Sequence, residues 1–285
     1  AATFGQAIPI MGYTGDSKEG WGNRQYSWVS NVLLEHELTS QVGVSVGYYR
    51  TWFGNKVVTD NLNIARSDHD PFCFTTPVDA RLPGGGAQQV CGVYDVTKAA
   101  SLRARNNLRV LSDNTQVYNG LDLLLHANFD NGGILQGGYN TGQTVTDSCT
   151  TAPDKIPQFC RNVAPWEGQH NFKFAGAMPL GKGITASATF LNLPGASWAA
   201  NSSVPNDDIS ASLGRNLSAC TNATGTCSAV ARVALFQSGS QFEPRQTQLD
   251  FRIGADIAAG NYRIMPRLDI FNMLNANDVQ RVSST

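Results

Sequence analysis

A regular alternation of apolar and polar side chains organises this chain and limits the folds open to it. In segment 41–48, Val42, Val44, Val46 and Tyr48 alternate with small or polar residues. Successive side chains of a β-strand point to opposite faces, so a period of two predicts strands with one apolar face. The pattern recurs at 26–38, 121–129, 135–142, 172–178, 184–190, 249–257 and 262–270. The sequence therefore predicts an all-β protein of about eight strands.

The alternation also predicts which side chains share a face of the sheet. One face is expected to carry Val42, Val44, Val46, Leu249, Phe251, Ile253, Tyr262, Ile264, Leu268 and Ile270. The other face is expected to carry Asp250, Arg252, Arg263, Arg267 and Asp269. In a barrel the apolar set faces lipid, whereas in a sandwich it faces a second sheet.

Connections between the predicted strands alternate between short and long. Tight, turn-rich links stand at 39–40, 130–133, 181–183 and 259–261, and long links run over about 54–114, 145–165 and 194–245. Short turns on one side and long loops on the other favour an antiparallel up-and-down β-barrel, or a barrel-derived sheet, as one domain over 1–285. A soluble sandwich or other extracellular β-fold is the alternative, although it predicts shorter links at both ends.

Composition argues against a nucleic-acid-binding protein. Charged residues make up 15% of the chain and the formal net charge is −1, so no basic field is available for nucleic acid. We expect at most one or two short helices, both in long loops, with one at 97–105 and an extra strand at 229–236.

Six cysteines stand in the long links, none of them in the C-x-x-C spacing of a zinc site. Their even number and close spacing predict an oxidising compartment and three disulfides between sequence neighbours. The expected pairs are Cys73 with Cys91, Cys149 with Cys160, and Cys220 with Cys227.

Few residues suggest chemistry. Asp68 and Asp70 are candidate oxygen ligands for calcium, but the twelve-residue spacing of a calcium loop is absent and turn capping explains them better. Ser45 lies in a G-x-S-x-G sequence, yet inside an alternating strand rather than at the strand-to-helix turn that a nucleophile needs. We therefore expect no catalytic residues, no metal site and no cofactor, and no enzymatic activity.

Several phrases resemble a known family. They are Trp21-Gly22-x-Arg24-x-Tyr26-x-Trp28, Gly47-Tyr48-Tyr49-Arg50-x-Trp52-x-Gly54-Asn55, Asp79-Ala80-Arg81-Leu82-Pro83, Gln248-Leu249-Asp250-Phe251-Arg252 and Asp269-Ile270-Phe271-Asn272-Met273-Leu274-Asn275. Together they resemble the late barrel strands of TonB-dependent-receptor-like outer-membrane proteins of the type with a carboxypeptidase-regulatory-like domain. The resemblance implies a bacterial outer-membrane location and, for the whole protein, uptake of a bulky nutrient. The plug and the aromatic-ended final strand of that family have no counterpart in 1–285.

The alternative function is an extracellular structural or assembly protein, like a filament or surface layer, built from a barrel-derived sheet. Partners expected under the two hypotheses are outer-membrane lipid or the rest of a larger barrel, and like subunits joined through edge strands. Under both hypotheses, strands 26–38 and 262–273 are the terminal strands of the sheet, and each has an outer edge of backbone N–H and C=O groups. Neither strand carries the lysines that protect such an edge from pairing with another chain. We expect both strands to be hydrogen-bonded to each other, to strands outside this segment or to a neighbouring subunit.

Overall fold

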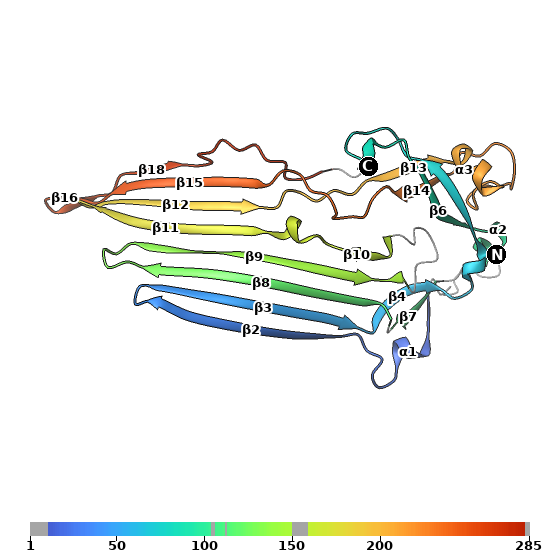
Figure 1. The fold of residues 1–285 in the computed structure, drawn as a ribbon, viewed down its shortest axis with the longest axis horizontal. Coiled ribbons are helices and arrows are strands. Elements are labelled where there is room, and N and C mark those ends of the chain that lie inside the picture. Colours follow the sequence, from blue (N-terminus) through green and yellow to red (C-terminus); the bar gives the residue numbers. More distant parts are fainter. Residues whose placement is uncertain (1–10, 104–105, 112, 150–158, 283–285) are drawn as a thin grey trace.

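The computed structural model describes residues 11–103, 106–111, 113–149 and 159–282 (Figure 1). It is dominated by an antiparallel sheet, the main sheet, with strand order β18-β15-β12-β11-β9-β8-β3-β2 and with β10 paired to β9 off this path. Its strands are β2 (Tyr26–Thr39), β3 (Val42–Gly54), β8 (Thr115–Asn128), β9 (Ile134–Asp147), β10 (Arg161–Val163), β11 (Asn171–Gly181), β12 (Ile184–Leu193), β15 (Gln246–Ala255) and β18 (Arg267–Ile270). The order along the main path follows the chain, so the sheet is an up-and-down meander.

Neighbouring strands are joined by short turns at one end of the sheet and by long links at the other. Short turns connect β2 to β3, β8 to β9 and β11 to β12. The long links gather at the opposite end of the molecule (Figure 1). The predicted all-β class with an antiparallel, up-and-down sheet is confirmed. The sheet is open, because within the described residues β2 and β18 each pair on one side only.

The cross-strand register assigns each side chain to a face, since directly opposed residues of an antiparallel pair point to the same side. Val46 pairs with both Leu34 and Leu123, and Phe251 pairs with both Ala188 and Ile270. One face, the apolar face, thus carries Val42, Val44, Val46, Leu249, Phe251, Ile253, Leu268 and Ile270. The opposite, polar face carries Asp250, Arg252, Arg267 and Asp269, together with Glu35, Glu37, Asp122 and Lys173. The predicted division is confirmed for the residues of the main sheet. The other three predicted residues, Tyr262, Arg263 and Ile264, lie in a separate two-stranded ladder, so the register of the main sheet does not assign them to a face.

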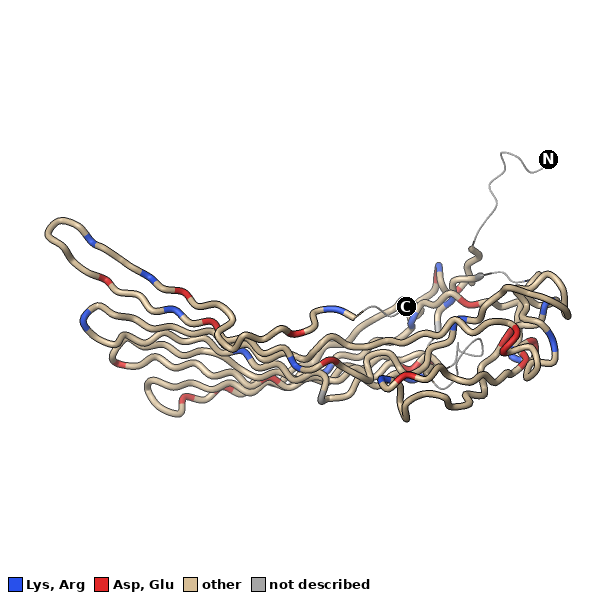
Figure 2. The backbone as a smooth tube through the Cα atoms, turned by 90° about the horizontal axis from the view of Figure 1, so that it is seen from above, with Lys and Arg blue, Asp and Glu red and all other residues tan. Residues whose placement is uncertain are grey.

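The final hairpin is interrupted in its middle. Beyond β15 and before β18, β16 (Ile257–Ala259) and β17 (Tyr262–Ile264) form a separate two-stranded ladder in which Ile257 opposes Ile264. The break coincides with Pro266, which has no N–H to give to a ladder. The β16–β17 hairpin reaches farthest from the loops and leaves the layer of the other strands (Figures 1 and 2).

The long links form structure of their own. Hairpin β5 (His69–Thr75) and β6 (Gln89–Val96) comes from the first link, and β13 (Asn201–Pro205), α3 (Asn206–Leu213) and β14 (Val230–Ala234) come from the third. We call these five elements, with segment 214–229, the loop assembly. A smaller sheet has the order β1-β7-β4 and is built from β1 (Gly12–Tyr13), β4 (Lys56–Asn61) and β7 (Asn106–Leu111). The remaining elements are α1 (Gly15–Lys18), α2 (Lys98–Leu102) and the short 3-10 turns η1 (Arg66–Asp68), η2 (Pro83–Gly85) and η5 (Trp166–Gln169).

The expectation of one or two helices was wrong. The described residues contain α1, α2 and α3, and α1 precedes β2 rather than lying in a long link. Of the predicted segment 97–105, residues 98–102 form α2, and 104–105 lie outside the described residues. The missed helix α3 begins after Pro205, carries acidic side chains in its first turn and ends at Leu213, where Gly214 caps it with a left-handed φ of 74°. The extra strand predicted at 229–236 is β14.

The buried core lies in the loop assembly and not beneath the main sheet. Its cluster comprises Phe72, Phe74, Val93, Val204, Ile209, Leu217, Cys220 and Val233. The disulfides join Cys73 to Cys91, Cys149 to Cys160 and Cys220 to Cys227, the same pairs that the cysteine spacing predicts. Two of the three bridges therefore close loops within the segment that has its own core.

Candidate functional site

The polar face of the main sheet is hollowed into a trough of about 950 Å³. Strands β2, β3, β8, β9, β11 and β12 all contribute to its wall. The polar residues that line it from this face are Glu35, Glu37, Ser45, Asp122, His126, Gln136, Asn140, Lys173 and Thr189. Each of these side chains lies on the polar face by register, so the trough is a property of the sheet's alternation.

Small residues open the trough. Gly43 opposes both Glu37 and His126, and a Cβ placed on Gly43 would meet nothing within 4 Å. Gly138 opposes both Leu124 and Lys173 in the next part of the wall. A side chain at Gly43 would occupy open space in the hollow, whereas a Cβ on Gly138 would lie 2.4 Å from the Leu123 carbonyl oxygen, so Gly138 permits the close approach of β8.

Charge is distributed unevenly across the trough. Glu35, Glu37 and Asp122 come from β2 and β8, and Lys173 comes from β11. His126 lies between them, with its Nε2 2.8 Å from the Asn128 amide nitrogen. Among the described residues, no group of three or more His, Cys, Asp or Glu is arranged to hold a metal ion. The arrangement suits contact with a polar, neutral or weakly cationic ligand over a broad surface.

Two tyrosines form a shelf on the same face, on the loop side of the trough. The Tyr118 ring covers Gly120 and Gly142, since a Cβ on Gly142 would lie 2.5 Å from this ring. The Tyr49 ring covers Gly47 in the same manner. Rings packed over strand glycines stabilise a sheet, and here they also give the polar face an aromatic surface beside the trough.

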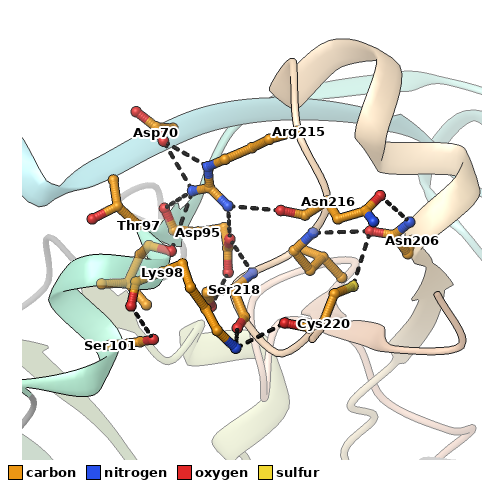
Figure 3. A network of polar contacts seen from close by, with 12 residues as sticks. Asp70, Asp95, Thr97, Lys98, Ser101, Asn206, Arg215, Asn216, Ser218 and Cys220 are labelled. Atoms are coloured by element: carbon orange, nitrogen blue, oxygen red, sulfur yellow. Dashed lines mark hydrogen bonds and ion pairs between the residues drawn. The ribbon is translucent and has the colours of Figure 1, made fainter. Parts of the chain in front are cut away.

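A polar network joins the long links at the end of the sheet (Figure 3). Arg215, which follows α3, pairs with Asp70 of β5 at 2.9 Å and with Asp95 of β6 at 2.7 Å. Asp95 also accepts hydrogen bonds from the backbone N–H and the hydroxyl of Ser218. Lys98 donates to the carbonyls of Ser218 and Cys220. The first and third links are thereby bound into one unit.

The calcium candidates lie in this region, each beside a guanidinium. Asp70 pairs with Arg215, and Asp68 pairs with Arg103 at 2.6 Å. The Ala65 backbone N–H also donates to Asp68, and this bond, with the bond from Arg103, lowers the pKa of the Asp68 carboxyl. The structure therefore gives both carboxylates positive or N–H partners from the protein itself.

Sequence reasoning did not identify the trough or the network. The trough carboxylates follow the same alternation from which the two faces are predicted. The sequence of one strand, however, does not show which side chains of the other five strands stand beside its own. Arg215 and Asp70 are 145 residues apart. No local pattern connects them.

None of the helices that the structure describes has the length and apolar character needed to cross a membrane.

No model of a known family matches the sequence, and no curated protein sequence matches it. Among solved structures, the outer membrane transporter YddB from Escherichia coli is similar over 89% of this chain, with 8% identity and a TM-score of 0.42. The chain spans 29% of the length of that transporter.

Proposed function

We propose that this chain is a β-barrel segment of a TonB-dependent-receptor-like protein in the bacterial outer membrane. The whole protein would take up a bulky nutrient and would not act as an enzyme. The apolar face would contact lipid, the polar face would line the lumen, and the loop assembly would stand outside the cell.

One observation supports this proposal most strongly: the apolar face of the main sheet has no covering layer in the described chain. On the inner strands, Val46 and Leu123 are 39% and 41% exposed, and on the edge strand β18, Leu268 is 58% exposed. The core cluster that the chain does bury contains no residue of the main sheet. A soluble sandwich would bury such a face against a second sheet, whereas a membrane barrel exposes it to hydrocarbon.

The distribution of charge supports the same proposal. Within β2, β3, β8 and β9, the acidic residues Glu35, Glu37 and Asp122 lie on the polar face. On the apolar face of these strands, Arg50 and Asp147 stand near the loop end, and His36 stands near the turn end. The middle of the apolar face is thus free of charge, as contact with lipid requires.

A matched pair of substitutions tests the proposal, because Ser45 and Val46 are neighbours on β3 that point to opposite faces. The full-length protein is folded into lipid bilayers, and folding is followed by the difference in gel mobility between heated and unheated samples. Val46→Lys places a charge in hydrocarbon, which costs about 2–4 kcal/mol near the midplane, so less protein should fold. Ser45→Lys should fold as the parent does. Equal folding of both variants, or folding of the parent without lipid or detergent, would refute the membrane assignment.

The open edges favour a second candidate, an extracellular assembly protein. Every residue of β2, Tyr26–Thr39, is exposed, and its outer edge has no strand partner in the described chain. An unpaired edge of this length is a template for a neighbouring subunit. Ordered arrays in detergent-free buffer, seen by electron microscopy, would favour this candidate over transport.

A further inference from the structure

A polar row crosses the apolar face near its loop end. By register, Ser30, Arg50, Asn119 and Gln143 lie side by side across β2, β3, β8 and β9. On the loop side of this row stand Trp28 and Trp52, and on the other side stand Val32, Tyr48 and Leu121. The row therefore separates an aromatic end of the face from its apolar middle.

Arg50 is the sole lysine or arginine of these four strands, and it is exposed. Its Nη1 donates to the Asn119 Oδ1 at 3.1 Å, and this same oxygen accepts from the Tyr48 hydroxyl at 2.9 Å. In the described part of the chain, Arg50 has no carboxylate partner. Most of the N–H donors of its guanidinium are therefore available to an outside group.

Aromatic residues flank this cation on the same face of β3, with Tyr48 before it and Trp52 after it. The guanidinium carbon of Arg50 lies 6.0 Å from the centre of the Trp52 ring, and Trp52 stacks on Trp28 at 6.5 Å. Trp28, Tyr48 and Trp52 are 62%, 43% and 36% exposed. Tryptophan and tyrosine at the end of a lipid-facing strand occupy the level of the lipid headgroups.

The position of Arg50 along its strand agrees with that level. Val42 marks the turn end of β3, and Arg50 stands eight residues farther along. This separation is about 26 Å along a strand, or about 20 Å across a membrane at a tilt of 40°, close to the height of an apolar band of about 25 Å. The backbone of Arg50 then lies about 5 Å inside the edge of this band, and the long side chain can extend outward so that its guanidinium reaches the phosphate layer.

We propose that Arg50, with Trp28, Tyr48, Trp52 and Asn119, forms a binding site for the phosphate of an outer-leaflet lipid. The inference rests on the proposed membrane function, which makes the apolar face a lipid surface. The guanidinium gives paired N–H donors that match phosphate oxygens, and the rings pack against the first carbons of the acyl chains. The absence of a counter-charge among the described residues leaves the anion to be supplied by the membrane.

Native mass spectrometry of the full-length protein in detergent tests the site, with phosphatidic acid, phosphatidylcholine and inorganic phosphate as probes. The parent protein should retain phosphatidic acid in preference to phosphatidylcholine. Arg50→Gln should weaken the retention of phosphatidic acid by about tenfold, the usual scale for losing one charge-assisted hydrogen bond. Arg50→Lys should keep part of the affinity. Lys182→Gln, at the turn end of the sheet, is the matched control and should bind as the parent does.

Equal retention of phosphatidic acid by the parent and Arg50→Gln would overturn the site. Displacement of phosphatidic acid by an equal concentration of inorganic phosphate would also overturn it, because the proposed ligand is a lipid and not the free ion. The membrane function has its own test: if Val46→Lys fails to fold and Ser45→Lys folds, while Arg50→Gln binds normally, only this inference fails. If Val46→Lys folds like Ser45→Lys, the proposed function fails with it.

Discussion

The guanidinium of Arg215 donates from its Nε to the Asp70 carboxylate at 2.9 Å, across 145 residues of chain. Asp70 belongs to the first long link and Arg215 to the third, so this contact joins two loops that leave the sheet at different strands. The same guanidinium donates to the carbonyls of Asp95 and Val96. Its side chain is only 19% exposed, so water provides a poor replacement for these partners.

Substitution of Arg215 should therefore release the two loops from each other. We expect Arg215→Met to destabilise the loop assembly by about 2 kcal/mol, because it leaves two carboxylates without their shared cation. Hydrogen exchange at β5 and α3 should accelerate, and exchange at β8 and β9 should not change. Arg81→Met is the matched control, since the Arg81 side chain is 70% exposed and pairs with its sequence neighbour Asp79. Equal effects of the two substitutions would contradict this account.

The disulfides should support the loop assembly and not the main sheet. Cys220 belongs to the buried core, and the Cys73–Cys91 bridge closes hairpin β5–β6. Replacing Cys73 and Cys91 with serine should cost the loop assembly about 3 kcal/mol, the scale for a loop of this length. Differential scanning calorimetry in reducing and oxidising buffer should show the change in a separate, lower transition. A shift of the main transition by the same amount would show that sheet and loops unfold together.

Much of the fold could be predicted because alternation is a local signal. Val42 and Val44 on one face, and Asp250 and Arg252 on the other, follow from the period of two and from the register it imposes. Pro266 also marks the place where the last strand breaks. The loop assembly could not be predicted, because its core joins Phe72 to Val204 and Ile209 through contacts distant in sequence. The trough was missed for a related reason: its lining depends on six strands lying in register.

Acid should break the Asp79–Arg81 ion pair at an unusually low pH. Hydrogen bonds from the Arg81 side chain and from its backbone N–H lower the pKa of Asp79 from 3.8 to about 2. Because the folded pKa is the lower one, the pair's contribution to stability is complete above pH 3.8 and disappears as pH falls through about 2. The carboxyl carbon shift of Asp79 in an NMR titration should have its midpoint near 2. In Arg81→Met the midpoint should return toward 3.8, and a parent midpoint already near 3.8 would rule out the pair.

Two glycines of the trough should respond differently to the same substitution. A Cβ on Gly43 would meet nothing within 4 Å, whereas a Cβ on Gly138 would lie 2.4 Å from the Leu123 carbonyl oxygen. Gly138→Ala should therefore destabilise the sheet by about 2 kcal/mol, because the backbone of β8 must shift. Gly43→Ala should leave stability nearly unchanged. Urea unfolding of the two variants beside the parent measures the difference, and equal midpoints would show that the close approach at Gly138 is absent.

The backbone groups along the outer edge of β2 have no strand partner in the described residues. β2 bonds to β3 along one side, so an unpaired edge would leave alternate N–H groups of β2 open to water. Hydrogen exchange along Tyr26–Thr39 would then alternate between slow and fast residues.

We expect the assembled, full-length protein to show slow exchange at every residue of β2. An uncovered edge costs several kcal/mol per group in lipid and invites another chain in water. Dilution at constant detergent concentration identifies the partner: protection that disappears on dilution indicates a neighbouring subunit, and protection that persists indicates a strand of the same chain. Alternating fast exchange in the assembled protein would contradict both and would leave β2 as a true edge.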